Sequence, residues 1–298
     1  MQQVYQLSDL LPANLQYGNN TVKLGVLGNP IAHSKSPQMQ QAALDAAQLP
    51  HSYIRIYAET ENSAFENTVQ HLRTLGFIGA NVTIPFKKRA LCLADSADTL
   101  STLCGAANTL IFQGGLCHAA NTDGPGFARA IFEMSARHLH ELRIVILGAC
   151  GGAGSALAAQ CALSACPQIC LVNRPRPELQ HLCDTLAPHS TGRVDTCTFD
   201  ETSLLQQVIQ EADLIVNATA LGLHPGDPMP LPAEWLCPGQ FVYDIVTHDT
   251  PFRHQAATRG CTTANGLSML LWQGAYAFEH WFGFLPDIEA MREALLHC

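Results

Sequence analysis

Short apolar runs typical of β-strands alternate along this chain with longer segments of helical periodicity. In the first third of the chain, strands are expected at 22–27, 52–57 and 79–82, and helices at 36–48, 64–75 and 86–95. Strands that alternate with helices form mostly parallel sheets covered on both faces, so this order predicts an α/β fold. Two brief runs, 109–112 and 117–120, are joined by Gln113-Gly114-Gly115 and predict a hairpin.

A second series of the same kind begins after Asp123. Strands are expected at 143–147, 168–172, 214–217 and 241–245, and helices at 152–164 and 178–187. This doubly wound pattern is typical of a Rossmann-type dinucleotide-binding domain. A helix at 126–134 is expected to follow the boundary, and helices at 268–283 and 286–296 are expected to return to the first domain. The sequence thus predicts a substrate-binding and catalytic domain, residues 1–122 plus 265–298, and a dinucleotide-binding domain, residues 123–264.

The composition argues against several classes of protein. With 47% hydrophobic and 14% charged residues, the 298-residue chain can bury a substantial core. No apolar stretch approaches the roughly 20 residues that cross a bilayer, and the first residues do not resemble a secretion signal, so a cytoplasmic protein without membrane contact is expected. The net charge of −9, with only 16 lysines and arginines, argues against nucleic acid as a partner.

The twelve cysteines are scattered and include no CxxC pair. Zinc-type ligand spacing is therefore absent, and no metal is expected. Most of the cysteines have apolar neighbours, as in Ile169-Cys170-Leu171, which predicts reduced thiols that pack as small apolar side chains.

Three of the four lysines lie in two short polar motifs. Lys35 is part of GNPIAHSKSP, residues 28–37, and Lys87 and Lys88 end NVTIPFKK, residues 81–88. Because the net charge of the chain repels anions, an anionic ligand needs positive charge close to its site. Each motif follows a predicted strand, so it is either part of such a site or simply a polar loop.

A glycine-rich turn, GACGGAG at residues 148–154, follows the strand predicted at 143–147. Glycines allow the backbone to approach a pyrophosphate, whose charge is met by amide groups at the start of the next helix. The spacing of Gly148, Gly151 and Gly154 is irregular, with Cys150 apparently inserted. The alternative is that these glycines only allow close packing of the helix on the strand.

The next predicted strand ends in Val172-Asn173-Arg174-Pro175-Arg176. An NAD site usually has an acidic residue here, which binds the ribose hydroxyls, whereas arginines suit the 2′-phosphate of NADP. The sequence therefore favours NADP over NAD. The alternative is that both arginines lie in solvent at the start of a helix.

Two further motifs, GAANTL at 105–110 and NTDG at 121–124, also lie at strand ends. Asn and Asp at such positions most often form turns. Their combination with serine and lysine motifs, beside a dinucleotide-binding domain, indicates a ligand site.

Taken in order, these motifs resemble the shikimate dehydrogenase family, including its quinate/shikimate branch. The resemblance covers residues 22–285 and rests on GNPIAHSKSP, NVTIPFKK, GAANTL, NTDG, the glycine-rich turn, NRPR, NATALG at 217–222 and GLSMLLWQGA at 266–275. It implies an NADP-dependent enzyme of aromatic amino-acid and chorismate biosynthesis that reversibly reduces 3-dehydroshikimate to shikimate. The alkoxide formed by hydride transfer needs a proton, which a positioned acid or cation can supply.

The resemblance also implies roles for individual residues. Ser34 and Ser36 would bind the substrate carboxylate, with Lys35 adding charge nearby. Lys87 and Asp123 would form the catalytic pair, with the lysine acting as acid and base or as an electrostatic group. The ring hydroxyls would be bound by Thr83, Asn108 and Gln273. The cofactor would be bound by Gly148, Ala149, Gly151, Gly152, Ala153, Asn173, Arg174, Arg176, Thr219, Ile245, Gly266 and Met269.

Besides the Cys150 insertion in the glycine-rich turn, the chain departs from the family pattern at two places. Thr247 stands where the family typically has a tyrosine that helps to hold the carboxylate, and the loop before Thr250-Pro251 is shortened. Met39-Gln40 replaces a frequent histidine. Two alternatives therefore stay open: a dehydrogenase for quinate or another cyclic hydroxy acid that uses NAD or NADP, and a non-enzymatic nucleotide-binding regulator. A monomer or a homodimer is expected.

Overall fold

The computed structural model describes residues 4–12, 15–17, 20–61 and 63–297, so residues 1–3, 13–14, 18–19, 62 and 298 of the expected first domain lie outside it. The chain forms two compact units. One contains the chain up to Thr122 together with the segment from Gln273 onward, and the other is Asp123–Trp272. Residues 265–272, which the sequence analysis assigned to the first domain, cluster with the second unit.

The first unit contains a mixed sheet. Its strands are β1 (Val4–Tyr5), β2 (Gln16–Tyr17), β3 (Asn20–Gly28), β4 (His51–Tyr57), β5 (Gly79–Val82), β6 (Ser96–Ala97), β7 (Thr109–Gln113) and β8 (Leu116–Ala120). They pair in the order β1-β4-β3-β5-β7-β8-β6, with β2 beside β3. Strands β1, β4, β3 and β5 are parallel, whereas the predicted hairpin makes β7 antiparallel to both β5 and β8.

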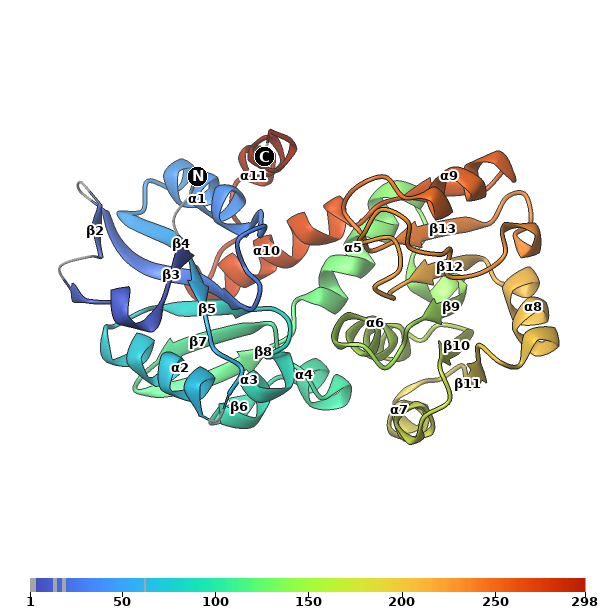
Figure 1. Ribbon diagram of the computed structural model, residues 1–298, viewed down its shortest axis with the longest axis horizontal. Helices are drawn as coiled ribbons and strands as arrows, with labels where there is room; N and C mark the ends of the chain where they lie inside the picture. Colours follow the sequence, from blue (N-terminus) through green and yellow to red (C-terminus); the bar gives the residue numbers. More distant parts are fainter. Residues whose placement is uncertain (1–3, 13–14, 18–19, 62, 298) are drawn as a thin grey trace. The chain divides into compact units, whose positions relative to one another are not determined.

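Helices cover both faces of this sheet. They are α1 (Ser36–Ala46), α2 (Ala64–Thr74), α3 (Lys87–Leu93), α4 (Thr99–Cys104) and α11 (Ile288–Leu296). Helices α1 and α11 lie above the sheet in Figure 1, and α2 and α3 lie below it. Phe65 of α2 stacks on Phe86, which directly precedes α3, with ring centroids 4.6 Å apart, and both are fully buried. This packing fixes the start of α3, where Lys87 lies.

The second unit is a doubly wound parallel sheet. Its strands are β9 (Arg143–Leu147), β10 (Gln168–Asn173), β11 (Arg193–Thr198), β12 (Leu214–Asn217), β13 (Phe241–Asp244) and β14 (Thr262–Ala264). They pair in the order β11-β10-β9-β12-β13-β14, and all pairs are parallel. The predicted α/β class is confirmed. The predicted strands and helices of both units all form, with ends shifted by three residues or fewer.

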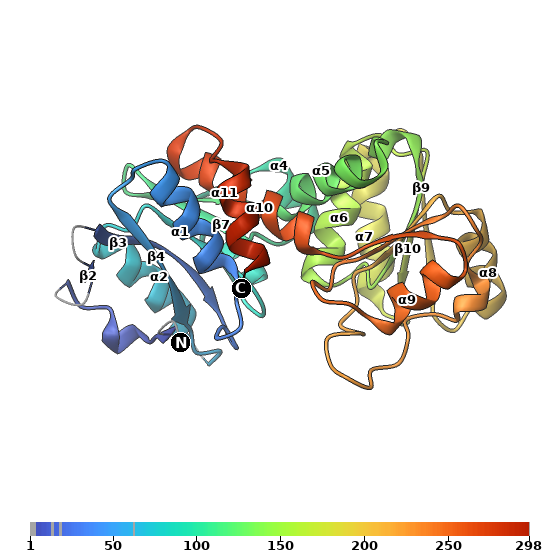
Figure 2. The same ribbon diagram turned by 90° about the horizontal axis from the view of Figure 1, so that it is seen from above.

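The helices of the second unit cover both faces of its sheet. They are α5 (Asp123–Ser135), α6 (Gly152–Leu163), α7 (Pro177–Leu186), α8 (Thr202–Glu211), α9 (Pro251–Thr258) and α10 (Leu267–Phe282), and α10 ends in the first unit. Helices α8 and α9 share a buried core with alternate residues of β9, β10, β12 and β13. Figure 2 shows α8 and α9 apart from α5, α6 and α7, which belong to the opposite face.

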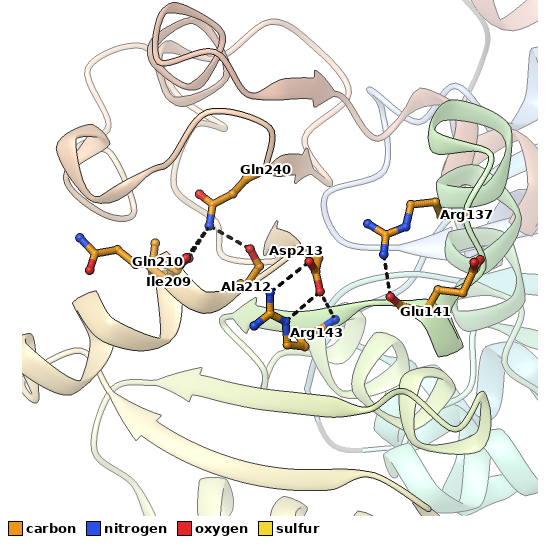
Figure 3. A network of polar contacts seen from close by, with 8 residues as sticks. All are labelled: Arg137, Glu141, Arg143, Ile209, Gln210, Ala212, Asp213 and Gln240. Atoms are coloured by element: carbon orange, nitrogen blue, oxygen red, sulfur yellow. Dashed lines mark hydrogen bonds and ion pairs between the residues drawn. The ribbon is translucent and has the colours of Figure 1, made fainter.

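The amino ends of the strands in the second unit carry structural contacts (Figure 3). The backbone amide and the Nε atom of Arg143 donate to Asp213 Oδ2 at 2.8 and 3.0 Å. Gln240 Nε2 donates to the carbonyls of Ile209 and Ala212 at 2.6 and 2.9 Å. These bonds join the amino ends of β9, β12 and β13 to one another. In a doubly wound sheet of this kind, ligands bind at the opposite, carboxyl edge.

The eleven cysteines that the structure describes are all free, and most are buried. Burial raises the pKa of Cys117 to about 11 and that of Cys170 to about 12. Within the described residues there is no group of three or more His, Cys, Asp or Glu side chains placed to hold a metal. None of the described helices has the length and apolar character needed to cross a membrane.

Candidate active site

Two loops of the first unit are tied together at the carboxyl edge of its sheet. The Thr83 amide, just after β5, donates to Leu27 O at 2.9 Å, and the Asn29 amide, just after β3, donates to Ile84 O at 3.1 Å. A Cβ on Gly28 would lie 2.6 Å from Thr83 Cγ2, so this approach requires glycine. The motifs GNPIAHSKSP and NVTIPFKK therefore meet at one edge, with Thr83 half-buried between them.

Ser34 and Ser36 lie at the junction of the first loop and α1. Ser36 is the first residue of α1 and is 8% exposed, and its amide donates to Ser34 Oγ at 3.3 Å. Ser34 is half-buried. Two hydroxyls and the first amides of a helix are suited to an anionic group such as a carboxylate.

Lys87 is the first residue of α3 and is half-buried. Its carbonyl accepts the amide of Ala107 at 2.9 Å, which joins NVTIPFKK to GAANTL. The neighbouring Lys88 is exposed. The structure thus distinguishes the two lysines by their burial, whereas in the sequence only the resemblance to the family favoured Lys87 over Lys88.

Asn108 lies in a buried polar network and is 2% exposed. Its Nδ2 donates to Thr122 Oγ1 at 2.9 Å and to Gln273 Oε1 at 3.4 Å. Its Oδ1 accepts the Thr122 amide at 2.8 Å. This network brings Asn108 and the half-buried Gln273 together, although 165 positions separate them in the chain. It also fixes Thr122, the residue before Asp123.

Asp123 is the first residue of the second unit and begins α5. It is 5% exposed. A carboxyl group so close to full burial is rare unless it is paired or hydrogen-bonded. The chain therefore holds a shielded acidic group directly after the Asn108 network.

The glycine-rich turn of the second unit depends on close backbone contacts. Gly148 has a φ of +83°, and a Cβ there would lie 2.9 Å from both Ala218 O and Thr219 N. Gly151 caps α6, Gly152 and Ala153 are its first residues, and Ala149 is fully buried. Cys150 lies partly exposed within the turn. The start of α6 thus presents backbone amides at the end of β9, the arrangement that binds phosphate.

The end of β10 carries the arginines. Asn173 is buried, and its Oδ1 accepts the Arg174 amide at 3.0 Å. Arg174 and Arg176 are exposed, and Arg176 precedes α7 without a side-chain capping bond. The Arg176 guanidinium therefore does not serve as a cap for α7, and an acidic residue is absent from this strand end.

The remaining cofactor candidates lie after β12 and β13. Thr219 Oγ1 donates to Asn217 Oδ1 at 2.6 Å, and Ile245 donates its amide to Asn217 O at 3.1 Å. A Cβ on Gly266 would lie 2.0 Å from Ile245 O, so the chain passes very close there. The amide of Met269 donates to Tyr243 Oη at 3.3 Å.

Thr247 is half-buried, and its carbonyl accepts Asn265 Nδ2 at 3.4 Å. The next residue, His248, contacts Gly222 O through Nε2 at 2.9 Å. The loop after β13 is thus held at Thr247 and at His248.

Comparisons with known proteins bear on the chain as a whole. A family model described as "Shikimate dehydrogenase substrate binding domain" matches residues 26–110, and "Shikimate 5'-dehydrogenase C-terminal domain" matches residues 266–296. The shikimate dehydrogenase (NADP(+)) of Moorella thermoacetica is 35% identical over 284 residues, which are 94% of this chain and 95% of that protein. The chain belongs to the shikimate dehydrogenase family.

Solved structures of the family have the same fold. Shikimate 5-dehydrogenase from Thermus thermophilus, in complex with NADP(H) and shikimate, has a TM-score of 0.81 and 32% identity, covering 93% of this chain and 99% of that one. Quinate dehydrogenase from Corynebacterium glutamicum, in complex with NAD, has a TM-score of 0.82 and 28% identity, covering 94% and 100%. The fold alone therefore does not distinguish these two substrates.

Sequence reasoning missed the residues of this family member that support the site motifs. Asn81 Nδ2 donates to Thr109 Oγ1 at 3.1 Å and receives a bond from Tyr53 at its own Oδ1. Arg55, in the middle of β4, contacts Ser34. A signal was present: Tyr53, Arg55 and Tyr57 alternate with the apolar residues Ile54 and Ile56.

Proposed function

We infer that this protein is an NADP-dependent shikimate dehydrogenase that reversibly reduces 3-dehydroshikimate to shikimate. The observation that carries this inference is the meeting of Ser34, Ser36, Thr83, Lys87 and Asn108 at one edge of one sheet. Hydroxyl, amide and ammonium groups together suit a ligand that has both a carboxylate and ring hydroxyls.

We propose that Ser34 and Ser36 donate their hydroxyl hydrogens to the substrate carboxylate. Thr83, Asn108 and Gln273 bind the ring hydroxyls in this proposal. The contact between Asn108 Nδ2 and Gln273 Oε1 supports it, because it holds two amide groups side by side before substrate arrives.

The proton of the reaction is assigned to Lys87. When NADPH is bound, it supplies the hydride to the ring carbonyl, and the chain must supply a proton to the oxygen that becomes a hydroxyl. We propose that the Lys87 ammonium donates this proton and takes it back in the reverse direction. Asp123 is proposed as the carboxylate that stabilises the positive charge of Lys87 during the reaction.

The second unit fits a phosphorylated dinucleotide. Its glycine-rich turn opens α6 at the carboxyl end of β9, and the guanidinium groups of Arg174 and Arg176 are exposed at the end of β10. We propose that Gly148, Ala149, Gly151, Gly152 and Ala153 surround the pyrophosphate. In the same proposal Asn173, Arg174 and Arg176 bind the 2′-phosphate, and Thr219, Ile245, Gly266 and Met269 line the rest of the cofactor site.

Thr247 is proposed to lie at the carboxylate end of the substrate, where its hydroxyl reaches less far than that of a tyrosine. This residue supports a second candidate function, the oxidation of quinate or a related cyclic hydroxy acid. The quinate dehydrogenase of Corynebacterium glutamicum has the same fold, so the fold is compatible with this candidate and with shikimate oxidation alike.

We also propose a cytoplasmic enzyme of aromatic amino-acid and chorismate biosynthesis, as a monomer or homodimer. The free, mostly buried cysteines suit a reducing compartment.

Initial rates with shikimate and with quinate, each with NADP and NAD, test the proposal. The highest kcat/KM is expected with shikimate and NADP. A higher kcat/KM with quinate would favour the second candidate. Absence of turnover with all four combinations, in a protein that still binds NADP, would contradict both shikimate and quinate oxidation and favour the regulator.

A further inference from the structure

One face of β4 supports the loops of the candidate active site. Alternate residues of a strand share a face, so Tyr53, Arg55 and Tyr57 point the same way. Tyr53 Oη donates to Asn81 Oδ1 at 2.8 Å, and Tyr57 Oη accepts Asn29 Nδ2 at 3.1 Å. Between these two contacts, Arg55 Nε donates to Ser34 O at 3.1 Å.

The Arg55 guanidinium contacts both the loop that contains Ser34 and the first turn of α1. Its Nη2 also donates to Ser34 O and, at 3.0 Å, to Gln38 Oε1 in the first turn of α1. The two acceptors lie on either side of Ser36. The planar guanidinium has several N–H donors in fixed positions and can bond both acceptors at once, whereas the ammonium of a lysine is a single point of charge.

Arg55 is only 5% exposed. A guanidinium stays charged in a protein, and burying a charge is unfavourable unless it is hydrogen-bonded or paired. A positive charge in surroundings of low dielectric acts on a nearby anion more strongly than a solvated one. In a chain of net charge −9, this charge contacts the backbone carbonyl of Ser34, one of the two serines assigned to the carboxylate.

We propose that Arg55 is a positioning residue for the substrate carboxylate, which fixes the Ser34–Ser36 segment and adds buried positive charge to it. The inference rests on the proposed function and deepens it. Arg55 acts through Ser34 and Gln38 and has no assigned contact with substrate. Because a carboxylate anchor contributes equally to the bound substrate and the transition state, its loss should raise KM with little change in kcat.

The experiment compares Arg55→Lys and Arg55→Met with a matched control, Arg73→Lys. Arg73 also donates to a backbone carbonyl and a glutamine, Gly115 O and Gln70 Oε1, but in a distant part of the same unit. Kinetics are measured with shikimate and with its carboxamide, which lacks the negative charge. Circular dichroism and thermal unfolding report whether each variant folds.

The shikimate KM is expected to rise about tenfold in Arg55→Lys and about a hundredfold in Arg55→Met, losses of roughly 1.4 and 2.7 kcal/mol. The ratio of kcat/KM for shikimate to kcat/KM for the carboxamide should fall as the shikimate KM rises. The kcat value, the KM for NADP and all constants of Arg73→Lys should stay close to those of the unsubstituted protein.

A folded Arg55→Lys with an unchanged KM, or with equal losses for shikimate and the carboxamide, would overturn the proposal. If Arg55→Met does not fold, Arg55→Lys alone decides. Failure of the proposed function is separate, because it would appear as absent shikimate turnover in the unsubstituted protein.

Discussion

Gly154→Ala is the sharpest test of the glycine-rich turn as a cofactor site. Gly154 lies in the first turn of α6, and a Cβ built on it would lie 2.3 Å from Gly148 O and 2.9 Å from Ala149 Cα. Both are backbone atoms, so no side chain can rotate away. To reach an ordinary contact of 3.4 Å, the new methyl group and the Gly148 carbonyl must separate by about 1.1 Å.

A shift of this size exceeds the tolerance of a hydrogen bond, whose N···O distance usually lies between about 2.7 and 3.2 Å. If the amides of the turn bind the pyrophosphate, the KM for NADP should rise at least about tenfold, a loss of about 1.4 kcal/mol. Overpacking should also lower the free energy of unfolding by about 1–3 kcal/mol. Equilibrium binding of shikimate alone should not change, because Ser34, Ser36, Thr83, Asn108 and Gln273 belong to the first unit and Thr247 is not part of the turn.

Gly239→Ala is the matched control. Gly239 belongs to the same unit and has a φ of +86°, but a Cβ there would meet nothing within 4 Å. Backbone strain of about 1–2 kcal/mol should lower its stability without disturbing the turn. Steady-state kinetics at saturating shikimate and thermal unfolding measure both effects. A folded Gly154→Ala with an unchanged KM for NADP would refute the assignment of the turn.

Three further substitutions test the proposed site. Lys87→Ala should lower kcat by about 10² to 10⁴, the usual contribution of a positioned acid, while shikimate still binds; turnover within about tenfold of the unsubstituted protein would exclude a catalytic role. Replacing Arg174 and Arg176 with glutamine should raise the KM for NADP far more than that for NAD, because only NADP has the phosphate; equal losses would contradict the assignment. Thr247→Tyr should lower the shikimate KM and leave NADP binding unchanged, and the gain in binding free energy should not exceed the roughly 1.5–3 kcal/mol of a charged hydrogen bond. An unchanged shikimate KM would place Thr247 outside the carboxylate site.

The sequence predicted those parts of the fold that carry a strong apolar signal. Strands β9, β10 and β12 are continuous apolar runs buried in the sheet, and their order identified the doubly wound unit. Strand β11, at one edge of the sheet, was missed because Arg193–Thr198 contains two charged residues, Arg193 and Asp195, and is only partly buried. Pairing with β10 makes it a strand, and such tertiary context is absent from local propensity.

Helices α4 and α9 were missed for a different reason. Helix α4, Thr99–Cys104, is short, begins at Asp98, whose side chain accepts the Ser101 amide, and ends at Gly105 with a φ of +66°. These capping signals are local and were available in the sequence. Helix α9 begins at the equally recognisable Thr250-Pro251, whose threonine accepts the Arg253 amide. Both helices lack the long apolar periodicity on which the predictions relied.

The site divides in the same way between residues that the motifs reveal and residues that hold them. Polar motifs that directly follow predicted strands can be recognised in the sequence. Because parallel strands bring their carboxyl ends to one edge of a sheet, such motifs can be predicted to lie close together. Arg55 acts on Ser34 from 21 positions away, and Asn81 receives Tyr53 from 28 positions away, so only folding brings these partners together. Because the supporting residues are proposed to position the substrate-binding segments, substitutions there should change KM and substrate preference. Substitutions at Lys87, in contrast, should change the rate of the chemical step itself.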